Sequence, residues 1–303
     1  MATTMLSLIQ SVRGELGLIV PTAVASSQDT DIKTTLALMN AAGQELVNMK
    51  AGGEPWNKLV VEYRFTTQYQ TLTGTCTIGS PVVTGISSTT GLDTTYMAVG
   101  TTPQDTYILS VDSPTQVTLS QNCTAGGSQT INFCKTQYTL PSDYKMMVGR
   151  TQWDKSKHWE MLGPLDGQQW QWLKSGYIST GPRVRFRLLN GLFQTWPALT
   201  TNEYLGYEYL SNGWATSNTG TRQTSFLADT DTCIFSDRLM IIGSKLKYFQ
   251  LKQFDTSSLM ADMQRELNIE IANDEPQPIL SYAPRTSEIL IGYDNIPDSG
   301  YGS

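Results

Sequence analysis

The chain has 303 residues, which is enough for two compact domains or for one domain with a large insertion. Only 16% of the residues are charged and 39% are hydrophobic, and Thr, Ser, Gln, Asn and Gly fill much of the remainder, as is typical of β-rich structural proteins. The net charge of −6 argues against a general nucleic-acid-binding protein, because contacts with phosphates need an excess of Lys and Arg.

The sequence has no run of about 18 apolar residues, so no membrane span is expected. Residues 1–20 include Arg13 and Glu15, and they lack the basic start and the small-residue cleavage site of a signal peptide. We therefore expect a protein made in the cytoplasm, whose four cysteines remain free thiols. With His158 as the single histidine, a histidine-based metal site or a Ser-His-Asp triad is disfavoured.

Two helices are predicted at the N-terminus. Apolar residues recur at helical spacing until Pro21, which cannot continue a helix. The polar run Ser26–Asp29 supplies caps for a second helix, and Gly52-Gly53 ends it. We expect residues 1–56 to form an antiparallel helix pair.

The middle of the chain has the pattern of β-structure. Residues 57–70 and 137–225 contain alternating or β-branched runs such as Val184–Leu189, and we expect them to form one β-rich domain. Between them, residues 71–136 are dominated by Thr, Ser and Gly, with short β-branched runs at intervals typical of a small sandwich. This segment predicts an inserted β-module.

Helical periodicity returns in residues 226–275, where Ser236 and then Asp255 or Ser257 are candidate caps of two more helices. Residues 276–303 contain four prolines and are expected to form an extended arm that docks on a partner. The apolar side chains that would make this contact are Ile279, Leu280, Tyr282, Ile289, Leu290, Ile291 and Tyr293.

This order of elements predicts an α+β fold. Each helix pair lacks a second layer of its own, so the simplest packing joins the N-terminal and C-terminal pairs in one four-helix bundle. The central β-rich region, which carries the inserted small β-sandwich, would project from that bundle.

Several short motifs occur in an order that resembles a known family. They are Leu8–Leu18, Tyr138–Tyr144, Trp153-Asp154, Gly163-Pro164, Trp170-Gln171, Ser175-Gly176, Tyr207–Asn212 and Phe226–Asp231. Through these motifs the chain resembles the head-to-tail adaptor, or connector, proteins of short-tailed bacteriophages and related prophages. The resemblance covers most of the chain outside residues 71–136 and 276–303, and the insertion is similar to the immunoglobulin-like modules of phage structural proteins.

The resemblance implies a non-enzymatic virion protein at the head–tail interface, assembled in the host cytoplasm. Such a protein joins the portal ring to the tail nozzle and lines the DNA ejection channel. It forms a homo-oligomeric, dodecameric ring, and its C-terminal arms, here residues 276–303, dock on the portal protein. The inserted module at residues 71–136 is a candidate contact for tail fibres. No cofactor and no membrane partner are expected.

Two sets of acidic residues were considered as sites. Asp229-Thr230-Asp231 has the alternating carboxylates of a cation loop but lacks the glycine and the distal Glu of an EF-hand, so turn hydrogen bonds are favoured over a metal. Asp143, Asp154, Glu160 and Asp166 lie close in sequence, as glycosidase carboxylates can, but sequence spacing does not fix their separation in space. We therefore assign no catalytic, cofactor-binding or metal residue.

Basic residues gather in two groups, which solvated surfaces explain but which are also candidates for weak, non-specific contact with DNA. The first contains Lys145, Arg150, Lys155, Lys157, Lys174, Arg183, Arg185 and Arg187, and the second contains Arg238, Lys245, Lys247 and Lys252. Two alternatives to an adaptor stay open. The Trp- and Tyr-rich β-region fits a glycan-binding tail-fibre or baseplate module, and a capsule depolymerase has less support.

Overall fold

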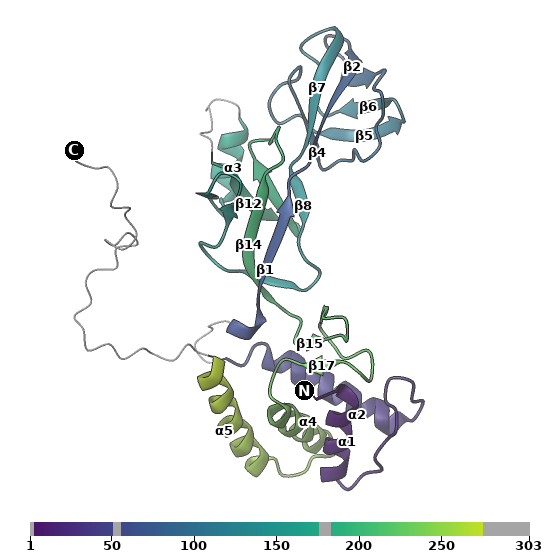
Figure 1. Ribbon diagram of the computed structural model, residues 1–303, viewed down its shortest axis with the longest axis vertical. Helices are drawn as coiled ribbons and strands as arrows, with labels where there is room; N and C mark the ends of the chain where they lie inside the picture. The colour runs from purple at the N-terminus through teal and green to yellow at the C-terminus, as the bar shows by residue number, and fades with distance from the viewer. Residues whose placement is uncertain (1–2, 51–55, 176–182, 275–303) are drawn as a thin grey trace, which may run out of the picture.

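The computed structural model describes residues 3–50, 56–175 and 183–274. The described part of the chain is elongated, with a layer of helices at one end, a β-body in the middle and a β-module at the other end (Figure 1). The expected arm, residues 276–303, lies outside the described residues.

Four helices form the layer at the ends of the chain: α1 (Met5–Glu15), α2 (Thr30–Leu46), α4 (Asp237–Lys252) and α5 (Ser257–Asp274). The caps follow the sequence, because Asp29 accepts a hydrogen bond from the second residue of α2 and the Ser236 hydroxyl accepts one from the N–H of Leu239. The first helix ends well before Pro21, since Gly17 takes a positive φ of 69° that favours glycine.

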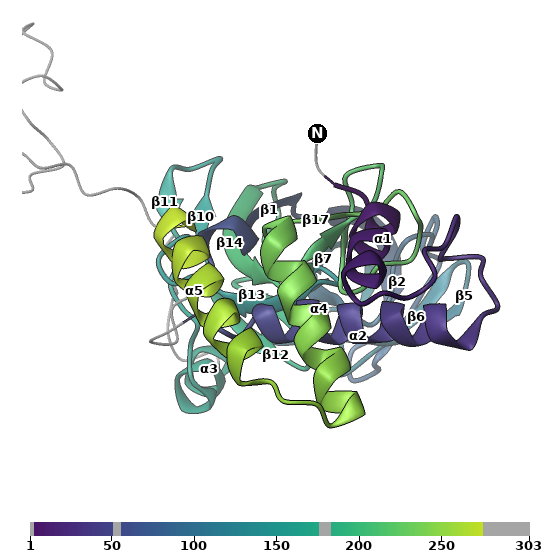
Figure 2. The same ribbon diagram turned by 90° about the horizontal axis from the view of Figure 1, so that it is seen from below.

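Helix α4 lies at the centre of this layer, and α2 runs across it rather than alongside it (Figure 2). Small residues allow the close crossing. A Cβ added to Gly243 would lie 3.4 Å from the Cβ of Ala42, and one added to Gly43 would lie 2.5 Å from the indole ring of Trp214. The helices therefore pack on each other and on an aromatic ring from the β-region.

The predicted four-helix bundle is wrong. Helix α5 packs on α4 but has no comparable contact with α1 or α2 among the described residues, and α2 crosses α4, so the four helices do not lie side by side as in a bundle. The apolar faces find their second layer elsewhere, because Trp56, Trp214 and Phe226, which lie outside the helices, are buried in the same cluster. The described chain is instead mostly antiparallel β-structure with helices at its two ends.

A small sheet lies against the helical layer. It consists of β15 (Ala215–Thr216), β16 (Arg222–Gln223) and β17 (Thr232–Cys233). The indole N–H of Trp214 donates to the carbonyl oxygen of Thr224 at 2.8 Å, which satisfies its polar atom inside the apolar core. The segment that follows β14 therefore belongs physically to the helical end of the molecule.

The β-body contains two sheets. One consists of β1 (Val60–Thr66), β14 (Tyr204–Ser211), β9 (Tyr144–Met147), β10 (Trp153–Asp154) and β11 (Trp159–Glu160), and the other of β8 (Gln137–Thr139), β12 (Arg185–Leu189) and β13 (Leu192–Trp196). Aromatic rings fill the space between them. The ring of Phe193 lies 5.7 Å from that of Phe65 and 5.2 Å from that of Tyr207, measured between centroids.

The inserted module is one antiparallel sheet. Its strands, in spatial order, are β4 (Tyr96–Val99), β7 (Gly127–Lys135), β2 (Tyr69–Cys76), β3 (Val82–Thr84), β6 (Gln116–Leu119) and β5 (Ile108–Ser113). An isolated bridge between Met97 of β4 and Tyr107, the residue before β5, brings the two edges of the sheet together around an apolar core. The described strands of the module thus form one sheet, whereas the small sandwich expected from the sequence would have two, and the immunoglobulin-like resemblance stays a prediction.

The module is packed against the body by helix α3 (Gly167–Lys174), which the sequence analysis did not predict. Trp170 and Leu173 of this helix are buried with Met97 of the module and Trp196 of the body. The ammonium of Lys174 lies 2.8 Å from an Asp105 carboxylate oxygen and donates to the Tyr107 hydroxyl. The insertion is therefore fixed to the body by both apolar and charged contacts.

Candidate functional site

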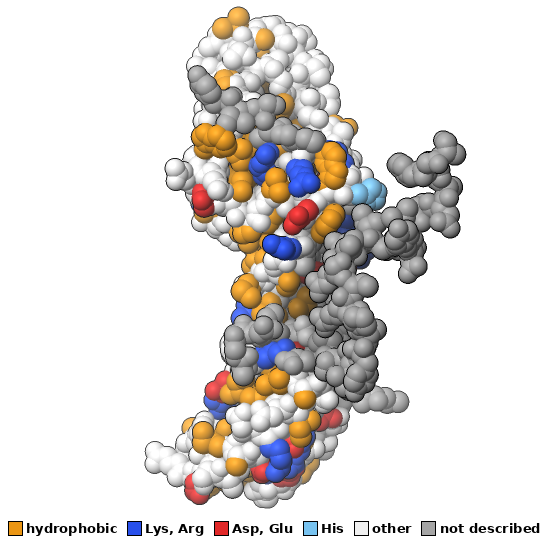
Figure 3. Space-filling view, turned by 90° about the vertical axis from the view of Figure 1, so that its left-hand side faces the viewer, with side chains coloured by type: hydrophobic (Ala, Val, Ile, Leu, Met, Phe, Trp, Pro, Cys, Tyr) orange, Lys and Arg blue, Asp and Glu red, His pale blue; other side chains and the backbone are white. Residues whose placement is uncertain are grey.

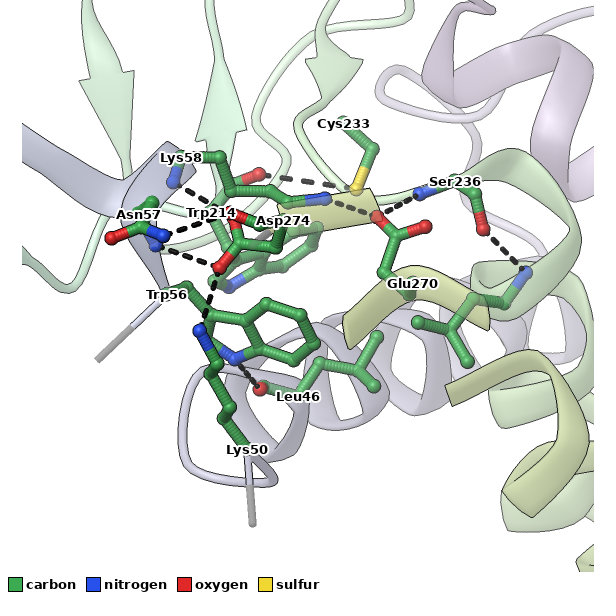
Figure 4. Close-up of polar contacts among 11 residues, drawn as sticks. Leu46, Lys50, Trp56, Asn57, Lys58, Trp214, Cys233, Ser236, Glu270 and Asp274 are labelled. Atoms are coloured by element: carbon green, nitrogen blue, oxygen red, sulfur yellow. Dashed lines mark hydrogen bonds and ion pairs between the residues drawn. The ribbon is translucent and has the colours of Figure 1, made fainter. Parts of the chain in front are cut away.

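The end of α5 is anchored where the chain passes from the helical layer into the β-body (Figure 4). The Asp274 carboxylate accepts hydrogen bonds from the backbone N–H groups of Asn57 and Lys58, at 2.8 and 3.0 Å. The ammonium of Lys50 lies 3.0 Å from the same carboxylate, and the Asn57 side-chain amide donates to the Asp274 carbonyl oxygen at 2.8 Å. We call Lys50, Asn57, Lys58 and Asp274 the junction.

One turn earlier on α5, Glu270 extends this network. Its carboxylate pairs with Lys58 and accepts a 3.2 Å hydrogen bond from the N–H of Ser236, the residue that caps α4. The Trp56 indole, fully buried beside these groups, donates to the Leu46 carbonyl at the end of α2. The junction thus joins α2, α4, α5 and the start of β1.

The electrostatics of the junction favour a charged Asp274. Burial by itself would raise the pKa of this carboxyl, but the N–H groups of Asn57 and Lys58 and the Lys50 ammonium outweigh that effect and lower the pKa below its usual value. The carboxylate is thus ionised at neutral pH and keeps its hydrogen bonds. The direct consequence is a fixed exit point for the residues that follow Asp274.

A groove of about 350 Å³ lies between α2, α4 and α5. The apolar side chains that line it are Ala42, Met49, Leu246, Met260, Met263 and Leu267. Three of these are methionines, whose flexible, polarisable side chains adapt to varied apolar ligands. Polar groups are confined to glutamines and to the Lys247–Glu45 ion pair, so the groove suits an uncharged apolar partner.

Large apolar side chains are exposed beside this groove. Leu251, Phe254 and Met260, at the turn between α4 and α5, are 55%, 57% and 55% exposed. Space-filling colours show hydrophobic side chains on this end of the molecule and on the β-body (Figure 3). Large apolar side chains exposed near an apolar groove mark protein–protein contact more often than they mark catalysis.

Asp229 and Asp231 act in the turn that precedes α4. The Asp229 carboxylate accepts hydrogen bonds from the N–H groups of Val24 and Ala25, at 3.1 and 2.8 Å, and Asp231 accepts from the N–H groups of Leu227 and Ala228. No cluster of three or more potential metal ligands occurs in the described ranges. The Asp229 carboxylate therefore fixes the N-terminal loop to the turn, and the Asp231 carboxylate closes the turn itself.

Three of the four carboxylates considered for glycan cleavage serve local structure. Asp143 accepts hydrogen bonds from the hydroxyls of Tyr209 and Ser211, at 2.8 and 2.5 Å, which brings two of the motifs named above together. Asp154 accepts from the N–H groups of its own turn, and Asp166 caps α3. These three side chains therefore have structural roles.

Half of the twelve cations in the two basic groups are engaged in ion pairs. In the first group, Lys155 pairs with Glu62, Lys157 with Glu203 at 2.7 Å and Lys174 with Asp105. In the second group, Arg238 and Lys245 pair with Glu15, and Lys247 pairs with Glu45. These pairs neutralise much of the positive charge that DNA phosphates would need.

The tryptophans divide into two classes. Trp56, Trp170, Trp196 and Trp214 are buried core residues, whereas Trp153, Trp159 and Trp172 are exposed. Trp172 is 56% exposed and lines an open hollow with Asp166, Gln168 and Gln169. Aromatic and planar polar side chains in one hollow are a chemistry that suits sugars as well as proteins.

Neither the junction nor the groove could be predicted from the sequence. Lys50 and Asp274 are single charges at opposite ends of the chain, and no local pattern links them. Met260 fits the apolar face of a helix, so helical periodicity predicts burial, yet its side chain lies at an open rim. The expected docking residues, from Ile279 to Tyr293, lie outside the described residues.

No family model matches the chain, and a search of curated proteins finds no match. None of the helices in the described ranges is both long and apolar enough to cross a membrane.

Proposed function

We propose that the protein is a non-enzymatic structural protein of a bacteriophage virion, a head-to-tail adaptor. In this role identical copies form a ring between the portal protein and the tail nozzle, around the channel through which DNA is ejected. Assembly takes place in the host cytoplasm, and the module at residues 71–136 is available to tail fibres.

The observation that carries the proposal is the apolar surface of α4 and α5. Leu251, Phe254 and Met260 are each more than half exposed beside an apolar groove, an arrangement that costs solubility unless a protein covers it. A ring presents each subunit with two neighbours, so it offers such cover. The order of the adaptor-like motifs gives independent support to the same function.

The junction supports the docking of the C-terminal arm, residues 276–303, on the portal protein. Asp274 fixes the point where the C-terminal arm begins, at the boundary between the helical layer and the β-body. An arm that starts from a fixed point keeps its docking residues within a limited radius, which raises their effective concentration at a partner bound to the same subunit. DNA contact, in this proposal, stays weak because most lysines are paired.

Mass photometry of the purified protein, alone and mixed with the portal protein of the same virus, tests the proposal. We expect a ring-sized complex to form with the portal. A stable trimer that ignores the portal would instead identify a fibre or receptor-binding protein. The Phe254→Asp variant, mixed with the portal protein in the same way, is expected to assemble poorly because the change places a charge on the exposed apolar surface. Leu227→Asp, at another exposed apolar residue, is the matched control and should assemble normally.

The exposed Trp172 favours a second candidate function, a glycan-binding tail-fibre or baseplate module. The hollow with Asp166, Gln168 and Gln169 would place the indole beneath a sugar ring and amide groups around its hydroxyls. Binding of host polysaccharide measured by calorimetry tests it. Loss of binding in Trp172→Ala, with retention in Trp153→Ala, would support this candidate, and no binding in the unaltered protein would remove it.

A further inference from the structure

The groove between α2, α4 and α5 is lined mainly by apolar side chains, among them Leu267 of α5. We propose that residues 279–282, the first apolar run after the junction, dock in this groove of their own subunit and cover it before assembly. The inference goes beyond the adaptor function, because it concerns the isolated subunit and requires no portal.

Geometry sets the length of chain that is needed. The groove residues of α5 extend from Leu267 to Met260, which lie seven and fourteen residues before Asp274, or about 10 and 21 Å along a helix that rises 1.5 Å per residue. An extended chain covers about 3.3 Å per residue. Ile279 and Tyr282 can therefore reach about 16 and 26 Å from Asp274, which spans the groove.

The apolar character of residues 279–282 also matches the lining of the groove. The groove is lined mainly by apolar side chains, among them Met260 and Met263, and its one lysine is already paired with Glu45. Residues 279–282 are Ile, Leu, Ser and Tyr, and none is charged. Pro276 and Pro278 follow Asp274 within four positions, and proline is disfavoured in the interior of a helix.

Residues 279–282 are favoured over a free partner as the occupant of the groove, because they are covalently linked to α5. A short tether places its ligand at an effective concentration on the order of millimolar, above that of most proteins in solution. Because Asp274 is held by Lys50, Asn57 and Lys58, the tether starts from a fixed point close to the groove. The cost of ordering a short tethered segment is correspondingly small.

Hydrogen-exchange mass spectrometry of the full chain tests the proposal. The backbone amides of residues 279–282 are expected to exchange at least about tenfold more slowly than in a free peptide of the same sequence. Met260→Glu, a change at a half-exposed groove residue, is expected to abolish this protection. Ile269→Glu is the matched control, because Ile269 is 49% exposed on α5 but does not line the groove, and it should keep the protection.

Three outcomes would overturn the proposal. Exchange of residues 279–282 at the free-peptide rate in the unaltered chain would show that the arm does not dock. Protection that survives Met260→Glu would place the arm elsewhere. Protection that grows with protein concentration would assign the groove to the arm of a second copy. The reciprocal variant Leu280→Asp should lose protection without any change in the groove, which separates docking from damage to α5.

Discussion

The carboxylate of Asp274 and the ammonium of Lys50 lie 3.0 Å apart, although the two residues are separated by 224 positions in the chain. Their side chains are only 2% and 4% exposed. Charges that are so well buried are costly unless they are paired and hydrogen-bonded, and here backbone N–H groups complete the set. The pair therefore links the C-terminal end of α5 to the chain that leaves α2.

Asp274→Asn should destabilise the protein by about 2 kcal/mol, since it removes a buried charge that accepts from three donors. The loss is measured as the change in free energy of unfolding in urea. Asp262→Asn, which alters an exposed ion pair with Arg265, is the control and should cost less than about 1 kcal/mol. Equal effects of the two variants would contradict the importance of the junction.

The Asp274 contribution should depend on pH in one direction. The folded protein lowers the pKa of this carboxyl, so the stabilisation is complete above the unfolded pKa, near 3.9, and is lost as the pH falls through the lower folded pKa. The stability difference between the natural chain and Asp274→Asn should thus be constant from pH 7 to 5 and shrink below about pH 4. A difference that grows on acidification would refute this assignment.

Two glycines provide a matched test of helix packing. Gly43→Ala should cost about 1–3 kcal/mol, because the new Cβ would meet the Trp214 ring at 2.5 Å in a fully packed core. Gly14→Ala, in α1 with nothing within 4 Å of the new atom, should be neutral or stabilise by up to about 1 kcal/mol. Thermal and urea unfolding measure both, and a neutral Gly43→Ala would show that the crossing of α2 and α4 is looser than described.

Lys174 should hold the inserted module on the body. Lys174→Met removes the ammonium that contacts Asp105 and Tyr107, and we expect a loss of about 1–2 kcal/mol with faster proteolysis at the module boundary. Lys252→Met, whose ammonium only approaches the Tyr248 ring at 5.6 Å, should change stability by less than about 0.5 kcal/mol. No difference between them would mean that the apolar contacts alone suffice.

The thiols should be inert in the folded protein. Burial raises the pKa of Cys134 to about 11 and that of Cys233 to about 12, so the reactive thiolates are rare at pH 8. We expect Ellman's reagent to react slowly with the native protein and to titrate four thiols in guanidinium chloride. Rapid reaction of one thiol in the native state would indicate that the surrounding core opens readily.

Local structure could be predicted from the sequence where a short-range rule acts. The cap at Ser236 and the apolar spacing that follows predict α4, and the alternation in Val184–Leu189 predicts β12. Helix α3 was not predicted because its two tryptophans in eight residues resemble a strand as much as a helix.

Packing between segments that are distant in sequence could not be predicted from capping and periodicity. The four-helix bundle followed from the need of each helix pair for a second layer, but Trp214 and Phe226 supply that layer from the β-region. Nothing in the local sequence of Trp214 distinguishes a body residue from one that fills the space beside Gly43. The junction could not be predicted for a related reason. It depends on the contact between Lys50 and Asp274, which lie far apart in sequence and meet only in the folded protein.

The pairing of β2 with β7 has a genetic consequence. Tyr69 lies opposite Cys134, and the N–H of Lys135 donates to the carbonyl oxygen of Gln68 at 2.8 Å, so the chain enters and leaves the module at neighbouring points. An inserted module whose ends lie this close together can be gained or exchanged by recombination without a change in the backbone of the β-body. A transplanted module would nevertheless leave Met97 exposed unless the new protein supplied a counterpart of Trp170. Exchange therefore requires little change in the backbone but a matching apolar surface on the receiving protein.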